Sequence, residues 1–396
     1  MLDEEKKEQK NLMIAMILVV GVLVAFNRFM GQPKETVAVE SQPVTTEVVV
    51  ADTASAPDTF IVAEEPEQII LLQNDKVSGR MTDRGSMTDL DLMTYRQTTA
   101  EDSPAVNLWG ENYQASLMWS GLSEKPQTEE NKKLTPATPV TLVWENDSVK
   151  VSREISLDDN YLLTFTDTLT NKTGQEVNMT LTGKVWRTTD SVPSDRSTVH
   201  EGFLGLFDNT EKEERYAAIT PDKPFQTQNK GGWIGLTDKY WQTIWVPDQQ
   251  ATVQMAFQQA DDRYVASFQE PVKIKAGETV KRVTRLFGGA KELDLINAYE
   301  AQGIPRFDLS IDFGWYYFLT KPFLYFLGWL YSLVGNMGIA ILIFATLIRI
   351  ALLPIATKSY ESMAKMKKIQ PKIQALQERF KDNRAQLQIE MMNLYK

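Results

Sequence analysis

Two long apolar stretches constrain this chain more than any other feature, because each must be buried in a protein core or in lipid. Residues 12–26 and 313–355 hold almost no charged side chains, although the 396-residue chain has a polar mean hydropathy of −0.29. The charges divide accordingly: residues 29–320 hold 27 Lys and Arg against 44 Asp and Glu, and residues 357–396 hold nine against four. The chain therefore has an acidic middle and a basic end, separated by hydrophobic segments.

The first stretch, with its flanks, is long enough to cross a membrane. Residues 11–30 supply the ~20 residues that a spanning helix needs. This segment could be the apolar region of a cleaved signal peptide or an uncleaved signal anchor. Residues 24–27 read Val-Ala-Phe-Asn and offer no small-x-small cleavage site, which favours the anchor. Lys6, Lys7 and Lys10 before it fit a cytoplasmic N-terminus.

The acidic middle predicts a large antiparallel β-sandwich. Residues 31–63 are rich in Pro, Thr, Val, Ser and Glu and are expected to form a linker. After the linker, short β-like runs alternate with turn residues and no helical period intervenes, which is typical of a sandwich. A helix is expected over Glu292–Ala301, ended by Gly303-Ile304-Pro305. The predicted strands are Gln68–Gln73, Ala115–Trp119, Val140–Trp144, Ser148–Ile155, Tyr161–Leu169, Val177–Trp186, Tyr240–Val246, Thr252–Gln258, Tyr264–Gln269 and Thr279–Phe287.

Residues that could carry covalent chemistry are scarce in this region. The chain has one histidine, His200, and no cysteine, which excludes disulfides, thiolate nucleophiles and His-pair metal sites. His200 is expected to be a surface or hydrogen-bonded residue, and Asp158-Asp159 and Asp261-Asp262 to be turn residues. Lys230-Gly231-Gly232-Trp233-Ile234 lacks the residues of a phosphate loop and predicts a turn into a strand. Seven tryptophans could line a sugar cleft but are more typical of a core: Trp109, Trp119, Trp144, Trp186, Trp233, Trp241 and Trp245.

The second apolar stretch divides into an aromatic part and a spanning part. Residues 315–332 are dense in Trp, Tyr and Phe, which favours the membrane interface. Residues 334–338 form a break, and Met337–Ile355 has the composition of a spanning helix. Arg349 lies inside that span, where a charge is costly. It could reach the interface by snorkelling, or it could face a watery cavity, and Thr346 at i−3 gives slight support to such a polar face.

The basic end follows the second span directly, so that side is expected to be cytoplasmic and the acidic domain external. Apolar residues at 366, 369, 373, 376 and 380 have helical spacing, and Pro371 is expected to kink this helix or to begin a new one. Asp382-Asn383 is a predicted break, and Leu387, Met391 and Leu394 are expected to start a second helix. This hairpin could lie on anionic lipid or dock a partner.

The second half closely resembles the bacterial YidC family of membrane-protein insertases. The resemblance is dense over residues 308–396 and looser in the middle domain, through Gly231-Gly232-Trp233 and the strand pattern. The residues that carry it are Asp312-Phe313-Gly314-Trp315, Pro322-Phe323, 330–338, Arg349 with Pro354, 360–366, 370–373 and 390–396.

The resemblance implies a mechanism without covalent chemistry: no enzyme, no cofactor and no metal. Such insertases hold a hydrophilic groove open to the cytoplasm and to lipid, and Arg349 matches the groove arginine, with Thr346 beside it. The implied partners are client membrane proteins, the Sec translocon, the ribosome, signal-recognition-particle targeting factors and anionic lipid, with no direct DNA binding. Family members continue with three more transmembrane helices, so this sequence is expected to be a truncated or partial one.

The fold class implied is a membrane protein of the bacterial inner membrane, with α-helical spans, a periplasmic β-supersandwich and a cytoplasmic helical hairpin. The expected segments are a cytoplasmic tail (1–10), transmembrane helix 1 (11–30), a linker (31–63), the β-supersandwich (64–305), an interfacial amphipathic helix (306–333), transmembrane helix 2 (336–355) and an incomplete cytoplasmic basic hairpin (356–396).

Two competing functions stay open from the residues alone. A membrane-anchored periplasmic carbohydrate-binding or carbohydrate-modifying protein would use the sandwich and would not need Arg349, although a single histidine argues against catalysis. A structural envelope anchor would accept any neutral apolar residue at position 349. An arginine within the span and the density of shared motifs favour the insertase.

Overall fold

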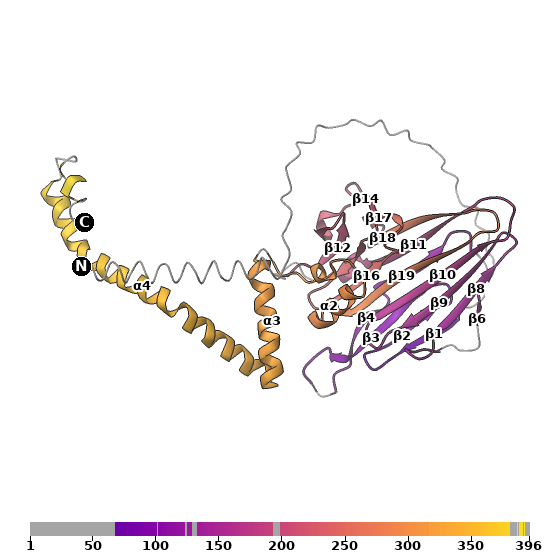
Figure 1. Ribbon diagram of the computed structural model, residues 1–396, viewed down its shortest axis with the longest axis horizontal. Helices are drawn as coiled ribbons and strands as arrows, with labels where there is room; N and C mark the ends of the chain where they lie inside the picture. Colours follow the sequence, from indigo (N-terminus) through magenta and orange to yellow (C-terminus); the bar gives the residue numbers. More distant parts are fainter. Residues whose placement is uncertain are drawn as a thin grey trace. The chain divides into compact units, whose positions relative to one another are not determined.

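The computed structural model describes residues 68–100, 102–122, 125–128, 133–192, 199–314 and 316–380, with residues 386, 388–390 and 392 beyond them. Most of these residues form two β-sheets, followed by three α-helices, as Figure 1 shows. The predicted tail, first span and linker (1–63), the break at Asp382-Asn383 and the second hairpin helix at Leu387, Met391 and Leu394 lie outside the described residues.

The first sheet has ten strands among the described residues, and β4 (Ala105–Trp109) joins it on β3. Its only parallel pair in the part described is β1 with β7. The order of the other strands is β14 (Phe225–Lys230), β17 (Thr252–Ala260), β18 (Arg263–Ile274), β11 (Val177–Thr188), β5 (Tyr113–Trp119), β3 (Ser86–Arg96), β2 (Val77–Thr82), β1 (Ile69–Gln73) and β7 (Lys133–Leu134).

The second sheet has nine strands in the same described part, and all of its pairs are antiparallel. Their order is β13 (Thr210–Arg215), β12 (Gly202–Phe207), β15 (Trp233–Thr237), β16 (Trp241–Val246), β19 (Thr279–Ala290), β10 (Leu162–Asn171), β9 (Val149–Leu157), β8 (Val140–Glu145) and β6 (Gln127–Thr128). Short 3-10 turns follow β11 and β13 at η1 (Thr189–Ser191) and η2 (Tyr216–Ala218).

The core lies between the two sheets because the strands alternate buried and exposed residues. In β9 and β11 every second side chain is buried, the period that a half-buried strand requires. Aromatic rings join the layers: Trp245 on β16 packs against Phe268 on β18, with ring centroids 6.0 Å apart. The indole of Trp109 on β4 donates to Thr243 Oγ1 on β16 at 2.9 Å. These contacts confirm the predicted antiparallel sandwich.

A buried ion pair on two adjacent strands of the second sheet also contacts the first sheet. Arg153 on β9 donates through Nε to Asp167 Oδ1 on β10 at 2.7 Å, and through Nη1 to the carbonyl of Leu117 on β5 at 2.7 Å. The indole of Trp119 donates to Asp167 Oδ2 at 2.8 Å. Both charged side chains are 1% exposed, so each depends on the other for its stability in the core. The pair serves the fold rather than a reaction.

All ten predicted strands are present, as is β15 after the predicted turn, and the other eight, which sequence reasoning missed, are short or carry few alternating apolar residues. The predicted turn into a strand is confirmed, because Gly231 (φ +65) and Gly232 (φ +80) lie between β14 and β15. Asp261 (φ +51) lies in the turn between β17 and β18, as expected.

The tryptophans and the histidine also have the ordinary roles predicted for them. Five of the seven tryptophans are buried and Trp186 and Trp241 are half-buried, so they belong to the core rather than to an open cleft. His200 Nε2 hydrogen-bonds the carbonyl oxygen of Phe203 at 3.0 Å.

A short helical segment closes one end of the sandwich. Helix α2 (Leu293–Ala301) matches the prediction and ends before Gly303, whose φ of +95 suits a glycine. The 3-10 turn η3 (Phe307–Ser310) follows, and the Phe307 ring is fully buried against Trp233, Phe287 and Tyr299. The sandwich core therefore extends past residue 305, the boundary that the sequence suggested.

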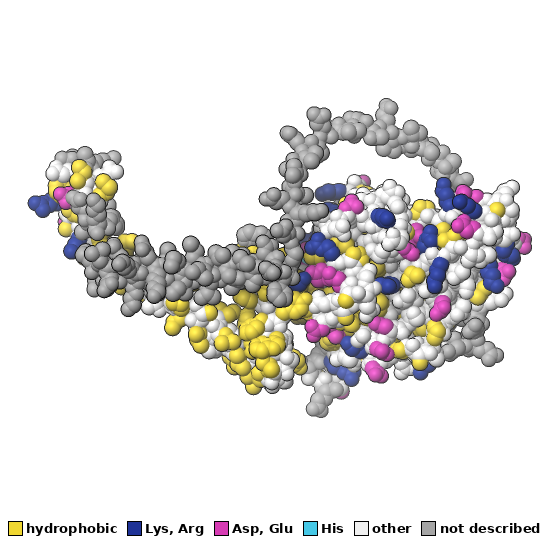
Figure 2. Space-filling view, viewed as in Figure 1, with side chains coloured by type: hydrophobic (Ala, Val, Ile, Leu, Met, Phe, Trp, Pro, Cys, Tyr) yellow, Lys and Arg dark blue, Asp and Glu magenta, His cyan; other side chains and the backbone are white. Residues whose placement is uncertain are grey.

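Two further helices follow: α3 (Tyr317–Val334) and α4 (Met337–Arg379). Helix α3 begins at Tyr317 rather than at residue 306, because residues 306–311 are held in the sandwich. Helix α4 continues past the predicted end of the span at Pro354, and Pro371 does not begin a new helix. A proline inside a helix removes one backbone hydrogen bond but has a φ that a helix accepts. Figure 2 shows apolar side chains covering much of α3 and α4, whereas the sandwich surface is charged and polar.

Candidate functional site

The helices α3 and α4 form a hairpin with a capped turn. Gly335 ends α3 in the left-handed conformation (φ +69), and its N–H donates to the carbonyl of Tyr331 at 2.8 Å. The Asn336 side chain begins α4 by accepting from Ile339 N at 3.2 Å, an N-cap hydrogen bond. The break predicted at residues 334–338 is thus a tight turn between the two helices.

The hairpin is held together by aromatic packing. The Phe344 ring on α4 lies 5.3 Å from the ring of Phe323 and 5.8 Å from that of Phe326, both on α3. Leu330 and Ala340 are buried beside them, with 5% and 0% of their surfaces exposed. One face of α4 is therefore covered by α3.

Arg349 and Thr346 lie on the other side of α4. At roughly 100° per residue, Arg349 lies about 140° around the helix from Phe344, and Thr346 lies about 160° from it. Both residues are exposed, and among the described residues Arg349 has no ion-pair or hydrogen-bond partner. The hairpin thus presents a cation on the face that α3 leaves open.

The hydroxyl of Thr346 is already engaged with its own helix. Thr346 Oγ1 donates to the carbonyl of Leu342 at 2.8 Å, which is the usual i−4 bond of a threonine inside a helix. The hydroxyl proton is therefore not available to a ligand, although its lone pairs are. The structure places Thr346 one turn from Arg349 and brings no hydrogen bond between them among the described residues.

Among the described helices, α4 alone combines the length and apolar composition to cross a membrane. Its exposed apolar residues include Leu342, Ile350, Leu353 and Ile355, which are each at least 62% exposed. Side chains of this kind need a lipid or protein environment. Arg349 lies among them, so its guanidinium is a charged group on a largely apolar surface.

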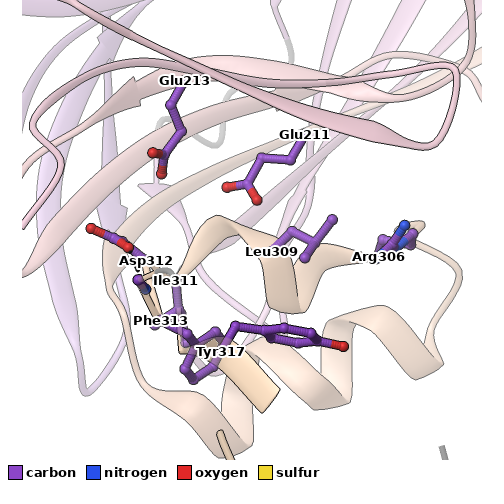
Figure 3. A pocket seen from close by; sticks show the side chains of 9 residues that line it. Glu211, Glu213, Arg306, Leu309, Ile311, Asp312, Phe313 and Tyr317 are labelled. Carbon is purple, nitrogen blue, oxygen red and sulfur yellow. Dashed lines mark hydrogen bonds between the residues drawn. The ribbon is translucent and has the colours of Figure 1, made fainter. Parts of the chain in front are cut away.

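A second feature, which sequence reasoning missed, is a pocket of about 400 Å³ at the end of the sandwich (Figure 3). Carboxylates from β13 and from the segment that enters α3 meet there, and Asp312 accepts from the backbone N–H of His200 at 2.9 Å. The lining residues are Glu211, Glu213, Arg306, Leu309, Ile311, Asp312, Phe313, Gly314 and Tyr317.

The crowding of carboxylates shifts their proton affinity. Burial, and then the neighbouring charges of Glu213, Asp312 and Asp308, raise the pKa of Glu211 to about 8. Burial also raises the pKa of Glu213, against the opposing effect of His200. Glu211 therefore retains its proton near neutral pH, but the described residues that line the pocket include no nucleophile beside a base. The alternating charged residues of β13 gave no sign from sequence that they would meet Asp312.

A third feature joins the sandwich to α3. Lys321 Nζ lies 2.5 Å from Asp308 Oδ2, and each side chain is 12% exposed. The Tyr325 hydroxyl donates to Asn297 Oδ1 on α2 at 3.0 Å. The signal in the sequence was Lys321 itself, an isolated cation inside an aromatic segment.

Comparison with known proteins covers nearly the whole chain. Residues 70–326 match the YidC periplasmic domain, and residues 329–396 match the 60Kd inner membrane protein family. The chain is similar to the membrane protein insertase YidC of Rickettsia bellii, with 34% identity over 98% of this chain and 74% of that protein. It is also similar to the insertase YidC of Granulibacter bethesdensis, with 34% identity over 98% of this chain and 73% of that protein.

Among solved structures, a galactose mutarotase-like protein from Lactobacillus casei aligns with 56% of this chain and 100% of its own. Its sequence identity is 9% and its TM-score is 0.39, a likeness too slight to support a conclusion.

Proposed function

The chain belongs to the YidC family of membrane protein insertases, which act in the bacterial inner membrane, and on this premise we propose that α4 forms one wall of a hydrophilic groove whose cation is Arg349. Thr346 lies one turn away on the same wall. The guanidinium attracts the acidic or polar external segment of a client protein while the client's apolar helix passes into lipid. No covalent bond is made or broken in this mechanism.

The observation that carries the proposal is the unpaired position of Arg349. A charged side chain near the centre of a spanning helix costs at least ~2.5 kcal/mol, and the described residues supply no carboxylate to offset that cost. Its position about 140° from the α3 contact turns it toward the side of α4 on which further helices or water can lie. A cation held in a watery cavity with low-dielectric walls attracts a negative group more strongly than it would in bulk water.

We assign the segments of the chain to the membrane as follows. Residues 1–10 and 356–396 are cytoplasmic, 11–30 and 336–355 span the bilayer, and 31–311 lie in the periplasm. The interfacial helix, which the sequence suggested over 306–333, is α3 (Tyr317–Val334). The support is the distribution of charge, because Lys and Arg are concentrated after the second span and the middle is acidic. The exposed aromatic residues of α3, such as Phe318 and Trp329, fit the interface.

The cytoplasmic part of α4 is the proposed docking site for other components of membrane-protein synthesis. Client membrane proteins are the partners that the family implies. We add the ribosome, signal-recognition-particle targeting factors and the Sec translocon as candidate partners, with anionic lipid beneath the basic residues. Exposed apolar side chains such as Met363 and Met366 interleave with those basic residues and suit adaptable contacts.

An insertion assay tests the role of Arg349. The natural protein is reconstituted in liposomes and given a small client with one or two spans, and wild type is compared with Arg349→Ala and Arg349→Lys. Insertion is expected to fall by about tenfold with alanine, which corresponds to the loss of an attraction of ~1.4 kcal/mol, and to recover partly with lysine.

The control is Lys273→Ala, which removes an exposed cation from β18 of the sandwich and is expected to insert the client as wild type does. Equal insertion by wild type, Arg349→Ala and Arg349→Lys would contradict the groove role, and Arg349 would then be a snorkelling residue. Inactive wild type with a competent client would contradict insertion itself.

A further inference from the structure

Lys321 is a cation that has no role in the proposed groove mechanism. It lies in the first turns of α3, between aromatic residues that suit the membrane interface. A lysine in such a helix is normally expected to extend its ammonium to lipid head groups. Here the side chain is 12% exposed and points instead to Asp308, 13 residues earlier in the chain.

Asp308 is a fixed point in the sandwich. Its backbone N–H donates to Glu300 Oε2 on α2 at 3.2 Å, and the adjacent Phe307 ring is fully buried in the core. The neighbouring residues are held as well, since Trp233 Nε1 donates to the Pro305 carbonyl at 2.9 Å and Gln242 Nε2 donates to Ser310 Oγ at 2.9 Å. The carboxylate therefore moves only with the sandwich.

A second contact lies one turn along α3. The Tyr325 hydroxyl donates to Asn297 on α2 at 3.0 Å, and Tyr325 lies only about 40° around α3 from Lys321. The Lys321 ammonium also lies 5.9 Å from the centre of the Phe313 ring. One face of α3 is thus attached to the sandwich through α2 and η3.

The opposite face of α3 is the one that contacts α4. Phe323 and Phe326, which pack on Phe344, lie about 140–160° around α3 from Lys321. Helix α3 therefore stands between the sandwich on one side and the helix with Arg349 on the other. Neither set of contacts alone would fix α4 relative to the sandwich.

We infer that Lys321 and Asp308 form a clamp that holds α3 on the sandwich and so positions α4 for insertion. Lys321 is a positioning residue in this arrangement and does not touch the client. The inference does not depend on the proposed role of Arg349, because it concerns the attachment of the hairpin rather than the chemistry of the groove. Although burial by itself lowers the pKa of Lys321, the bond and charge of Asp308 outweigh it and raise that pKa, which favours the charged ammonium.

A double-mutant cycle tests the clamp in the full protein. Lys321→Gln, Asp308→Asn and the double variant are reconstituted in vesicles of zwitterionic phosphatidylcholine, with and without phosphatidylglycerol. Backbone hydrogen exchange of residues 317–325 is measured. Each single variant is expected to speed exchange about tenfold, and the double variant to be no faster, because all three remove the same contact.

Matched controls separate the clamp from a general loss of charge. Asp294→Asn on α2 and Lys365→Gln on α4 alter exposed residues of the same types and should leave exchange in α3 unchanged. Unfolding of the sandwich, followed by tryptophan fluorescence, should keep its midpoint in every variant. Client insertion should fall in both single variants.

The clamp would be contradicted if Lys321 bound lipid head groups instead of Asp308. In that case Asp308→Asn would leave hydrogen exchange in α3 at the wild-type rate, and Lys321→Gln would speed it only in vesicles that contain phosphatidylglycerol. If a neutral variant fails to fold, the reversed pair Asp308→Lys/Lys321→Asp decides. Recovery of slow exchange and of insertion supports the clamp, and continued fast exchange in a folded reversed pair contradicts it.

Discussion

At the scale of single residues, the sandwich contains carboxyl groups whose effect on the free energy of folding depends on pH. Glu211 faces Glu213 and Asp312 across the pocket of Figure 3, with Arg306 as the nearby cation. Its pKa is raised to about 8 in the folded protein, whereas an ordinary glutamate titrates near 4.5. The folded state therefore binds a proton between these two values that the unfolded state has released, and stability falls as pH rises through this window.

Glu211→Gln is predicted to stabilise the protein at high pH. Above pH 8 the free energy of unfolding should rise by about 1–2 kcal/mol. A fully buried group would contribute more, ~1.4 kcal/mol for each unit of its pKa shift, but this carboxyl keeps partial contact with solvent. At pH 4 both states of the wild-type residue are protonated and the gain should vanish. Urea unfolding at pH 4, 6 and 9 measures this difference. Glu154→Gln, at an exposed position of β9, is the control, and a gain of equal size at all three pH values would contradict the explanation.

At the scale of elements, the turn between β14 and β15 depends on two glycines. Gly232 has a φ of +80, and a Cβ there would lie 2.3 Å from the carbonyl oxygen of Leu206 and 2.6 Å from Asn229 Nδ2. Asn229 Nδ2 also donates to the Gly231 carbonyl at 3.0 Å, which fixes the turn from the inside. Neither the backbone conformation nor the space accepts a side chain.

Gly232→Ala is predicted to destabilise the sandwich by about 2–3 kcal/mol, because it combines a strained φ with a clash against backbone. Gly277→Ala is the matched control. It has a similar φ of +69 but no atom within 4 Å of the added Cβ, so only the strain, about 1 kcal/mol, should appear. Urea midpoints of the two variants give the comparison. Equal losses of stability in the two variants would contradict a contribution from the clash with the Leu206 carbonyl.

Elements with a clear period were predictable from the sequence, and elements defined by their neighbours were not. The strand β11 alternates along its length and was found, whereas β13 is charged throughout and forms a strand only because it pairs with β12. The end of α3 was predictable from Gly335, but its start at Tyr317 was not, because residues 306–311 are held by buried contacts with distant strands. The position of Arg349 on a helix that is long and apolar enough to cross a membrane was likewise predictable, and its angle from the α3 contact was not.

The partners of charged residues were the least predictable feature. Lys321 and Asp308 lie 13 residues apart, and nothing local indicates that the intervening segment folds back. Arg153 and Asp167 appear in sequence as ordinary residues of amphipathic strands, yet both are buried. Such pairs follow from register and from the packing of the two sheets, which a sequence pattern of period two does not specify.

At the scale of the whole molecule, the sandwich is predicted to fold without the hairpin. Residues 68–312 contain the complete core that includes Phe307, and this fragment should be soluble and unfold cooperatively in urea. Extending it to residue 334 adds the exposed aromatic surface of α3. The longer fragment should sediment with phosphatidylcholine vesicles while the shorter one stays in the supernatant. Sedimentation of both fragments would contradict the placement of α3 as the interfacial element.

The lengths of the two hairpin helices have a mechanical consequence. Helix α3 has 18 residues and α4 has 43, which correspond to about 27 Å and about 65 Å of helix axis. The two helices meet at the turn of Gly335 and Asn336, and the axis of α4 is ~2.4 times as long as that of α3. When the pair pivots as one body, a shift of 2 Å at the start of α3 becomes a swing of about 5 Å at the far end of α4. A small displacement at the sandwich, where α3 is attached, is thereby amplified at the far end of α4.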